Sequence, residues 1–590
     1  MIVKMKKITL LLSANHRDET LKKLRKLGVL HIQNIQSPMS EDIQSLEAKL
    51  DNIYRALQLI SPGAEKQESI SSDKAFAAVE RILSLNQEME GLHREMEENQ
   101  ALASWFRNWG AVSFQSLQEL KDHGIFVRLY ITDKSGQKQI PDDKIIHIAK
   151  QEAGVVYLAL FSESPEDRLD FKEVAVPQVE FAEVEARIAK LTSRMEKIEG
   201  ELQSYSEIAD SLIALRKDLE KRLELNRVKY GMGASEQIHY LQGFCPIETV
   251  PEIEKNAESE GWGLVVQDPE DPTEVPTLTR NPKWMRMIEP LFDFMGTLPG
   301  YHEIDVSFVF LAFFTLFFAM LVGDGGYGLV FLFLTFIFGR KAKGSGRDFV
   351  NLMYVLSFIT IIWGLITGNW FGSEAIVKLP FLSMFVIPQL NTFADISTDV
   401  IMQFSFVIGV LQLSIGHLLA AFKKMNSLTA LAEIGWIVVL WSIFFVANNL
   451  VLGKDLPGIT MPLLLIGVAI IAVFANFQKN VLKGILQTIG NLPLDIISSF
   501  SDIVSYIRLF AVGFASFIVA SSFNTMAVGS GIDNVVSGII AAIVLFLGHT
   551  LNIALCGMSV LVHGVRLNML EFSGHVGVQW TGKQYLPFKE

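Results

Sequence analysis

The chain of 590 residues has little cysteine, and its two cysteines, Cys245 and Cys556, lie one in each half. This pair cannot build a disulfide framework or a thiolate metal site, which excludes a disulfide-rich secreted scaffold. Charge is scarce in residues 301–590, which carry 14 Lys and Arg against 14 Asp and Glu. The first 300 residues therefore hold the other 37 basic and 49 acidic groups and the whole net charge of −12. This contrast predicts an acidic water-soluble half joined to an integral membrane half, and it excludes a disordered chain or a wholly soluble enzyme.

The sequence also lacks a working phosphate-binding loop. Gly323–Gly328 spells GxGxxG between two apolar runs, whereas dinucleotide binding needs that motif between a strand and a helix. Gly577–Gln584 imitates a Walker loop, but Gln584 stands where Mg²⁺ needs Ser or Thr. The apolar run at residues 8–12 is too short for the core of a signal peptide, so the N-terminus is expected to stay in the cytoplasm. We expect no cofactor on this chain, and any linked ATP chemistry on another one.

Short apolar segments predict two small α/β lobes within a soluble domain at residues 1–297. The proximal lobe, about 1–40 and 230–266, has strand-like segments at 5–12 and 29–34 and helices at 17–27 and 251–260. It also includes YLQGF and GLVVQ. The distal lobe, about 110–175, has short strands at 125–132 and 155–161. A proline-punctuated linker, 268–297, is expected to lead to the membrane, because proline removes donors and disfavours helix before it.

Between the lobes, apolar residues recur at alternating steps of three and four, which is the seam of a coiled coil. The seam runs from Ile43 to Ile60, is interrupted at Ser61–Pro62–Gly63, and resumes more loosely through Val79, Ile82, Met89 and Met96. A second helix, expected over about 178–226, carries a seam from Val184 to Leu219. Both helices have charged flanks and can bury only a narrow stripe. The pattern therefore predicts an antiparallel coiled coil, about 41–105 and 178–228, that forms a strut with a lobe at each end.

Apolar runs predict a bundle of eight transmembrane helices in residues 298–590. The runs lie at about 306–322, 327–339, 349–370, 399–422, 429–452, 460–477, 488–528 and 535–570. The last two are long. At about 1.5 Å per residue, the final run would reach roughly 54 Å, beyond the ~30 Å hydrocarbon core, so both are expected to tilt or project.

Loop charges indicate the orientation of this bundle. With the soluble half in the cytoplasm, eight basic residues fall in inside loops: Arg340, Lys341, Lys343, Arg347, Lys423, Lys424, Lys479 and Lys483. The outside loops carry only Lys378 and Lys454. The positive-inside rule then places both termini in the cytoplasm of a multi-pass membrane protein.

One permanent charge lies inside a predicted span. Arg508 stands in SDIVSYIRLFAVGF with apolar residues continuing on both sides, and arginine cannot be neutralised. Such a charge costs at least about 2.5–3.5 kcal/mol at the bilayer centre, which marks a functional site. Asp502 lies about 120° round the helix at 100° per residue, so an intrahelical ion pair is not expected. Neither of the last two helices offers a carboxylate opposite Arg508, and the acid could belong to another chain.

The final helix carries a polar stripe. His549, Asn552, Cys556, Ser559, His563 and Arg566 are separated by steps of three and four and share an arc of roughly 100° on an α-helix. The stripe predicts one wall of an aqueous passage, although small polar residues also hold membrane helices together. On the preceding helix, polar positions before Arg508 could line another passage, and they are Asp495, Ser498, Ser499, Asp502 and Ser505.

Specific motifs along the whole chain resemble the membrane-embedded stator subunit of V/A-type rotary ATPases, called subunit I in prokaryotes and subunit a in eukaryotes. The most specific are SYIRLFAVG (505–513) and VHGVRLNMLEF (562–572), and GDGGYG (323–328) is less so. The resemblance implies a non-catalytic, ion-translocating subunit of the cell membrane. Its expected partners are a ring of proteolipid subunits, peripheral stalk subunits, a central-stalk adaptor and the lipid bilayer, with no nucleic acid.

The resemblance also implies roles for particular residues. Two half-channels for H⁺ or Na⁺ would meet at the arginines that match Arg508 and Arg566. Arg508 would displace the ion from each ring carboxylate. Asp324, His563 and Glu571 match motif positions that have secondary roles in access or packing. The chain departs from the pattern where many relatives have Glu ten residues before the second arginine, here Cys556, and where eukaryotic relatives have His, here Ser516.

Two other hypotheses stay open at this point. A self-sufficient secondary transporter could use Arg508 for an anionic substrate, although we see no second copy of the SYIRLF region, as repeated halves would require. A membrane-anchored signalling or scaffold protein would use its coiled coil as the active element and would leave the polar stripe unexplained.

Overall fold

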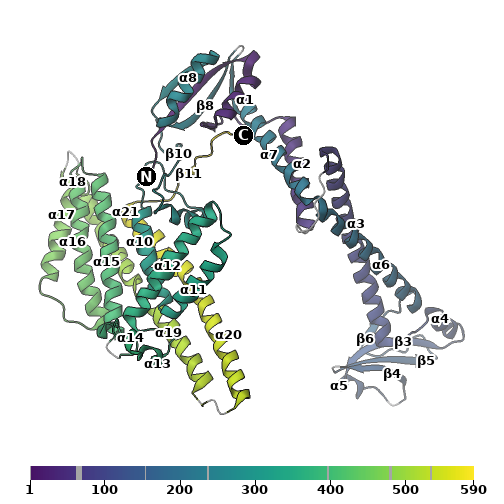
Figure 1. Ribbon diagram of the computed structural model, residues 1–590. Coiled ribbons are helices and arrows are strands. Elements are labelled where there is room, and N and C mark those ends of the chain that lie inside the picture. Colours follow the sequence, from purple (N-terminus) through teal and green to yellow (C-terminus); the bar gives the residue numbers. More distant parts are fainter. Residues whose placement is uncertain are drawn as a thin grey trace. The chain divides into compact units, whose positions relative to one another are not determined.

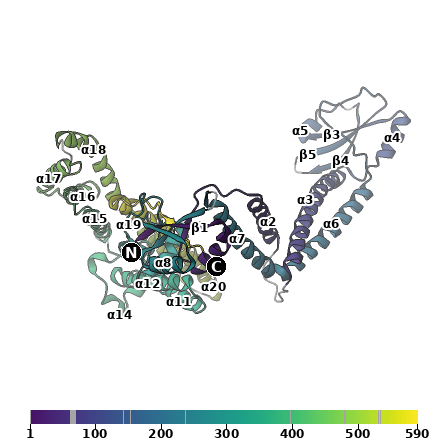
Figure 2. The ribbon, with the colours of Figure 1, turned by 90° about the horizontal axis from the view of Figure 1, so that it is seen from above.

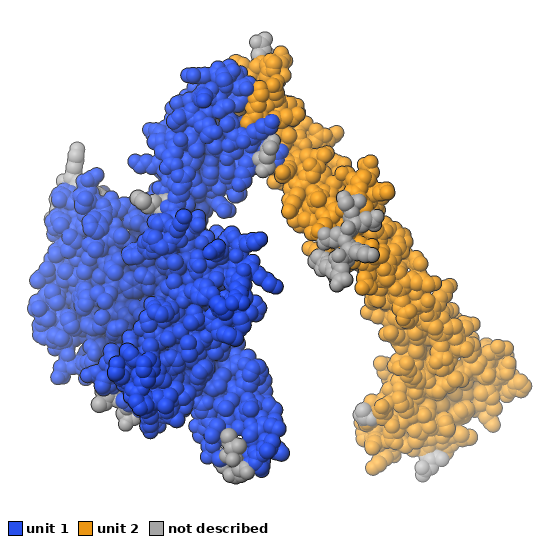
Figure 3. Space-filling model, viewed as in Figure 1, with its two compact units in different colours: residues 1–12, 24–33, 242–589 blue, residues 13–23, 34–241, 590 orange. Residues whose placement is uncertain are grey.

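The computed structural model describes the chain except residues 1, 61–69, 142, 153, 236–237, 395–396, 478–480, 530, 532–533 and 590. It divides into two compact units, which are coloured separately in Figure 3. The first unit contains residues 1–12, 24–33 and 242–589, and the second contains residues 13–23, 34–241 and 590. The boundary predicted near residue 297 separates a soluble domain from a membrane domain. The two compact units divide the chain at other residues and do not test that boundary.

Four long helices form the second unit. They are α2 (Glu41–Leu59), α3 (Ser72–Trp109), α6 (Phe181–Ser204) and α7 (Ala209–Gly231). Helix α3 packs on α6 and α2 on α7, side by side in Figures 1 and 2. The apolar residues of the predicted seams are buried between them, among them Ile43, Ile53, Ile82, Val184, Ile198 and Leu212. Ion pairs connect early residues of one helix to late residues of its partner, Glu47–Arg227, Arg81–Glu201 and Glu88–Arg194, so the pairs run antiparallel.

The predicted continuous helix through 178–226 is wrong at one place. A 3₁₀ turn, Tyr205–Ile208, separates α6 from α7. The interruption falls where the partner changes from α3 to α2, so the helix bends where its partner ends. The predicted break at Ser61–Pro62–Gly63 lies outside the described residues.

The far end of the α3–α6 pair carries a small α/β lobe, as predicted. Its sheet has the order β4-β5-β3-β6, with antiparallel pairs throughout. The strands are β3 (Phe126–Asp133), β4 (Ile145–Glu152), β5 (Val155–Ser162) and β6 (Lys172–Val174), and the helices are α4 (Phe114–Asp122) and α5 (Lys134–Gln137). Alternate residues Val156, Leu158 and Leu160 are buried with Tyr130, as expected for a sheet with one covered face.

A second sheet with the order β2-β8-β1-β9 confirms the strands predicted around residues 5–12, 29–34 and 263–267. The strands are β1 (Met5–Ser13), β2 (His31–Gln33), β8 (Ile238–Pro246) and β9 (Gly263–Gln267). Helices α1 (Arg17–Leu27) and α8 (Val250–Glu260) also match their predicted ranges. Burial raises the pKa of the Cys245 thiol to about 11, so this cysteine is a protonated core residue at neutral pH.

The end of the chain binds to this sheet region. Strand β11 (Lys583–Gln584) pairs in parallel with β10 (Pro276–Thr277). Beyond it, the Tyr585 hydroxyl donates to the Val29 carbonyl at 2.6 Å, and the Phe588 amide donates to the Leu30 carbonyl at 2.9 Å. The segment that follows the last long helix thus ties that helix to the α/β lobe by one side-chain and one main-chain hydrogen bond.

Apolar helices make up most of the first unit, and we call this bundle of helices the membrane unit. They are α10 (Ser307–Val322), α11 (Gly325–Gly339), α12 (Ser345–Thr367), α15 (Ser397–Lys423), α16 (Ala430–Leu452), α17 (Thr460–Phe474), α18 (Val481–Ser505), α19 (Ile507–Val528) and α20 (Val535–Ser559). Within the described residues, five helices are long and apolar enough to cross a membrane. They become six if α10 and α11, bent by 118° at the glycine loop, count as one span, and α17 is a shorter apolar helix. Short helices occupy the remaining segments, α9 (Glu289–Met295), α13 (Glu374–Val377), α14 (Pro380–Ser383) and α21 (Ser573–Val576).

Helices α11 and α12 approach closely at two glycines. A Cβ atom on Gly364 would lie 2.3 Å from the backbone nitrogen of Gly325 and 2.4 Å from its Cα. We expect Gly364→Ala to destabilise the membrane unit by about 1–3 kcal/mol, the range for overpacking a core, because neither backbone can move aside cheaply. Thermal unfolding of the purified protein in detergent measures the change. Gly490→Ala is the control, because its Cβ would meet nothing within 4 Å, and equal stability of the two variants would contradict the packing argument.

Candidate functional site

Arg508 lies at a break between the two long helices α18 and α19. Helix α18 ends at Ser505 and α19 begins at Ile507, so Arg508 stands in the first turn of α19. Its Nε donates to the Ser505 carbonyl at 3.0 Å. Its Nη2 lies 2.5 Å from Oε1 of Glu571, whose side chain is only 5% exposed. The expectation that neither long helix offers a carboxylate to Arg508 is therefore wrong.

The geometry of the final helix explains this difference. After α20 ends at Ser559, the chain continues through two π-helical segments, Val560–Gly564 and Leu567–Phe572. A π-turn bonds residue i to i+5 and inserts an extra residue in the helix face, often at a functional site. The predicted stripe counted 100° per residue as far as Arg566, and that count is wrong beyond Ser559. The two π-segments turn Glu571 toward Arg508.

Arg566 approaches the same carboxylate from the other side. Its Nε lies 3.7 Å from Glu571 Oε1, and its side chain is 55% exposed. Two permanent cations thus converge on one buried anion. Glu571 Oε2 is also buried and has no hydrogen-bond partner among the described residues. Glu571 is thus the shared counter-ion of both arginines.

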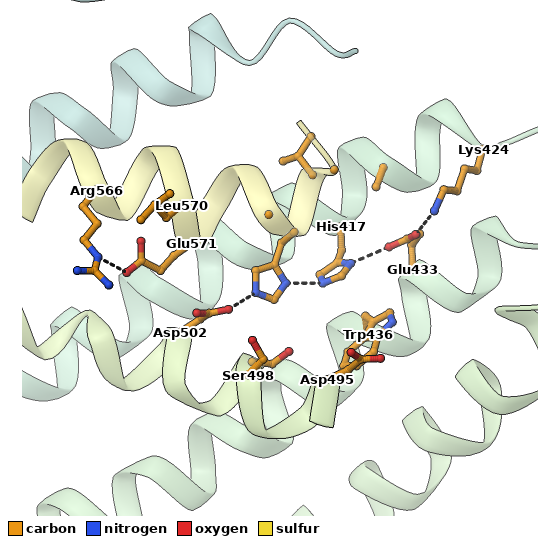
Figure 4. Close-up of a pocket in the computed structure, with 16 residues that line it drawn as sticks. His417, Lys424, Glu433, Trp436, Asp495, Ser498, Asp502, Arg566, Leu570 and Glu571 are labelled. Atoms are coloured by element: carbon orange, nitrogen blue, oxygen red, sulfur yellow. Dashed lines mark hydrogen bonds and ion pairs between the residues drawn. The ribbon is translucent and has the colours of Figure 1, made fainter. Parts of the chain in front are cut away.

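A cavity of about 610 Å³ opens beside this ion pair (Figure 4). Its lining comes from α15, α16, α18 and the end of the final helix. The charged and polar lining residues are His417, Lys424, Glu433, Asp495, Ser498, Ser499, Asp502, Arg566, Glu571 and His575. The serines and acids predicted to line a passage before Arg508 do line a cavity, with the exception of Ser505, which contributes its carbonyl to Arg508.

A continuous chain of hydrogen bonds crosses this cavity, as Figure 4 shows. Lys424 Nζ lies 2.5 Å from Glu433 Oε1, and Glu433 Oε2 lies 2.7 Å from His417 Nδ1. His417 Nε2 lies 2.8 Å from His575 Nδ1, and His575 Nε2 lies 3.0 Å from Asp502 Oδ2. We call these five residues the histidine chain. It joins the loop between α15 and α16 to α18, three residues before the break at Ser505.

Two residues of the predicted stripe, His549 and Asn552, belong to a separate cluster. The Tyr327 hydroxyl lies 2.8 Å from His549 Nδ1 and accepts from Asn552 Nδ2 at 2.9 Å. His549 Nε2 also lies 3.2 Å from the side-chain oxygen of Asn524. We call these residues the tyrosine cluster. None of them lines the large cavity, so the stripe divides between two sites within the described chain.

The two departures from the family pattern lie against each other beside this cluster. Ser516 Oγ is 3.1 Å from Cys556 Sγ, and both side chains are buried. Ser559 and His563 are half-buried, and His563 Nδ1 has no hydrogen-bond partner among the described residues. These two residues lie between the tyrosine cluster and Arg566 along the chain.

Asp324 caps the helix α11. Its Oδ1 accepts from the amides of Gly326 at 2.8 Å and Phe371 at 2.9 Å, and its Oδ2 accepts from the Gly372 amide at 3.2 Å. Its side chain is buried. A carboxylate held in this way by backbone donors fixes the glycine loop against the segment 369–372.

Three residues of the histidine chain were not predicted from the sequence, namely His417, Glu433 and His575. The signal was present for two of them, because His417 and Glu433 are ionisable residues inside predicted apolar runs, and the rule that selects Arg508 applies to them equally. His575 lies beyond the last predicted run and gave no such signal.

Because the Arg566 side chain is exposed, we expect its replacement by alanine to lower activity less than the replacement of Arg508. Its side chain is half exposed and its contact with Glu571 is long, and such pairs contribute only about 0.2–1 kcal/mol. We expect Arg566→Ala to lower ion-coupled activity by about ten-fold or less, corresponding to about 1.4 kcal/mol. Parallel assays of the Arg566→Ala and Arg508→Ala variants in one membrane preparation measure this difference. Equal losses would mean that the two arginines act as one unit.

These features define an integral membrane protein that has a charged site among its last long helices. The same chain also has an α/β region. No family model matches the chain. It is 30% identical over 618 residues to V-type ATP synthase subunit I of Borreliella burgdorferi, with both chains fully covered. It is 28% identical over 624 residues to V-type ATP synthase subunit I 1 of Treponema pallidum, again with full coverage. Against A-type ATP synthase subunit I of Methanocaldococcus jannaschii, identity is 27% over 72% of this chain and 66% of the relative.

Among solved structures, a crystal structure of the cytoplasmic N-terminal domain of subunit I, homolog of subunit a, of V-ATPase covers 44% of this chain and 99% of that one, with 18% identity and a TM-score of 0.24. Full-length identity to the curated relatives carries the assignment. The chain belongs to the family of V- and A-type ATP synthase subunit I. It is thus a membrane-embedded subunit of a rotary ATPase.

Proposed function

We propose that the chain is the stator and ion-channel subunit of its rotary ATPase and that it is not catalytic by itself. It provides two half-channels to the carboxylates of a rotating proteolipid ring, while ATP hydrolysis or synthesis takes place on other subunits. The observation that carries this proposal is the pairing of Arg508 with the buried Glu571 beside a polar cavity inside the membrane unit. A transport site needs a fixed charge of this kind next to water.

Arg508 performs the central step by electrostatics. An opposite charge within about 4–6 Å lowers the pKa of a carboxylic acid by roughly 1–3 units, so a ring carboxyl group that comes opposite Arg508 releases its ion. Glu571 holds the guanidinium paired between passages. This arrangement avoids an unpaired buried cation, which is costly in a medium of low polarity. The positive charge also blocks a direct leak of cations between the half-channels.

The two polar regions supply the two half-channels. The large cavity, with Asp502, is the half-channel on the side of the α15–α16 loop, which the positive-inside rule assigns to the cytoplasm. The tyrosine cluster, with His549 and Asn552, begins the other one, and Ser559 and His563 continue it toward Arg566. Asp324 supports that second path by fixing the glycine loop. The transported ion is H⁺ or Na⁺.

The membrane unit crosses the bilayer eight times in this proposal. The crossings are α10, α11, α12, α15, α16, α17, α18 with α19, and α20 with its π-segments. Both termini lie in the cytoplasm. Lys479, one of the eight inside residues in the charge count, lies outside the described residues, and the other seven still outnumber Lys378 and Lys454.

The paired helices of the second unit act as a coiled-coil strut. Their narrow buried seams and charged flanks suit a rigid spacer better than a binding surface. The distal lobe anchors peripheral stalk subunits, and the strut resists the torque that the rotating ring exerts on the membrane unit. The proximal lobe faces the central-stalk adaptor region.

Purification from native membranes tests this proposal. We expect the chain to copurify with a proteolipid ring and with ATP-hydrolysing subunits, and to transport ions only within that assembly. Recovery of a stable monomer that alone carries an anionic substrate across vesicle membranes would overturn the proposal in favour of a secondary transporter.

A further inference from the structure

The histidine chain consists of four titratable groups in direct contact, with a lysine at one end. The side chains of His417, Glu433 and His575 are 8%, 11% and 10% exposed, whereas Lys424 is 48% exposed and Asp502 is 28% exposed. Trp436 stacks on the His417 ring at 5.9 Å between centroids and 11° between planes, which fixes the orientation of that ring. The middle of the chain is therefore less exposed than its two ends, and its side chains line the cavity wall.

Counting protons shows what this chain requires. The contacts from Glu433 to His417, from His417 to His575, and from His575 to Asp502 are three hydrogen bonds, and each needs one proton. Two neutral imidazoles supply only two. With both carboxylates ionised, the 2.8 Å contact between the ring nitrogens would join two lone pairs. Three hydrogen bonds in this geometry thus require one proton more than the two neutral rings provide, and a carboxyl group at either end can supply it.

We infer that this chain conducts protons between the mouth of the cavity at Lys424 and the site at Glu571, so that the ion moved by this protein is H⁺. This inference rests on the proposed function and deepens it by choosing between H⁺ and Na⁺. Asp502, Glu571 and Arg566 line the same cavity, so a proton on Asp502 lies at the wall shared with the arginine site.

The transfer balances along the three bonds. A proton on Glu433 Oε2 moves to His417 Nδ1, the proton on His417 Nε2 moves to His575 Nδ1, and the proton on His575 Nε2 moves to Asp502 Oδ2. Each step breaks one O–H or N–H bond and forms another, and the net result is one proton carried from Glu433 to Asp502. Both rings end in the other tautomer, and each returns to the first by giving its Nδ1 proton to water in the cavity and taking a proton from that water at Nε2, so that the next proton passes in the same direction. Imidazole serves this role because one ring nitrogen accepts while the other donates.

Charges around the chain favour this path. Lys424 balances Glu433 at the open end, and at the other end Arg566, paired with Glu571, lines the same cavity as Asp502. Asp495 also lines the cavity, so the lining holds four carboxylates facing Lys424, Arg566 and the two histidines. The path therefore runs between groups that can take up and release a proton at both ends.

The test uses the whole complex in sealed vesicles and compares ATP-driven proton uptake in sodium-free and sodium-containing buffers. We expect His417→Asn and His575→Asn to lower proton uptake by about 10²-fold, the lower end of what a positioned proton-transfer group contributes. Asparagine keeps a donor and an acceptor but cannot pass a proton between them. His302→Asn is the matched control, because His302 is an exposed histidine outside both polar sites and should pump at the normal rate.

Chemical rescue separates relay from structure. Adding imidazole to the His575→Ala complex is expected to restore part of the proton uptake, because the cavity has room for the small base, and it should not rescue Arg508→Ala. Loss without rescue would assign the histidines a structural role and overturn the inference. Normal uptake in both asparagine variants, or ATP-driven Na⁺ uptake by the unmodified complex, would overturn it too. In each case a continued requirement for Arg508 would leave the proposed function standing, whereas full activity of Arg508→Ala would remove the proposed function itself.

Discussion

Arg508→Ala is expected to lower ion-coupled ATP hydrolysis and ion pumping by the complex by at least about 10³-fold, which is about 4 kcal/mol of lost electrostatic stabilisation. The reason is that alanine offers no charge to displace the ion from a ring carboxylate, and no neighbour replaces the guanidinium. Arg566 is the nearest candidate, but it lies on a separate helix and is already shared with Glu571. ATP-driven ion uptake into vesicles, with ATPase activity measured in the same sample, gives the result.

Assembly of the complex should survive this change. In the Arg508→Ala variant, Glu571 keeps Arg566 at 3.7 Å as a partner, so the buried carboxylate is not left without a counter-charge. Size-exclusion chromatography should therefore recover the complex with normal composition. Arg508→Lys, which keeps the charge on a different geometry, is the comparison variant and should retain part of the activity. Normal coupled pumping by Arg508→Ala would contradict the role assigned to this residue.

The soluble half could be predicted well from the sequence because its structure follows local periodicity. The strand at 5–12, the helix at 17–27 and the helix at 251–260 appear at their expected positions. The seams from Ile43 and from Val184 are buried as predicted. The one interruption that was missed, Tyr205–Ile208, reflects a change of partner helix, and sequence periodicity within a single helix carries no information about where its partner ends.

The membrane site could be predicted only in part, because its geometry depends on irregular backbone. Arg508 was identified from its position alone, since a permanent charge in an apolar run needs no structural context. Glu571 was named only through the family resemblance, and its pairing with Arg508 was missed, because two π-segments break the regular period that a sequence-based calculation assumes. The contact between His417 and His575 was not predictable either, since it joins residues 158 positions apart on different helices.

Glu571→Ala is expected to have the largest effect on stability, about 3–5 kcal/mol, which is the cost of removing one partner from a buried ion pair. The carboxylate is 5% exposed and is the ion-pair partner of both Arg508 and Arg566, so its removal leaves the less exposed cation, Arg508, without that counter-charge. Thermal unfolding of the detergent-purified complex should show this as a clear fall in Tm. Glu374→Ala, which removes an exposed carboxylate paired with Lys378, should change Tm little.

A double variant separates this charge argument from simple loss of packing. If Glu571→Ala is destabilising because it strands Arg508, then removing Arg508 as well should recover much of the lost stability. The pair would then show a coupling energy of about 1–3 kcal/mol in a double-mutant cycle. If the glutamate mattered only as a space-filling group, the two losses would add. Additive losses would mean that Arg508 does not depend on Glu571 for its counter-charge, and that a carboxylate of another subunit holds it even in the resting complex.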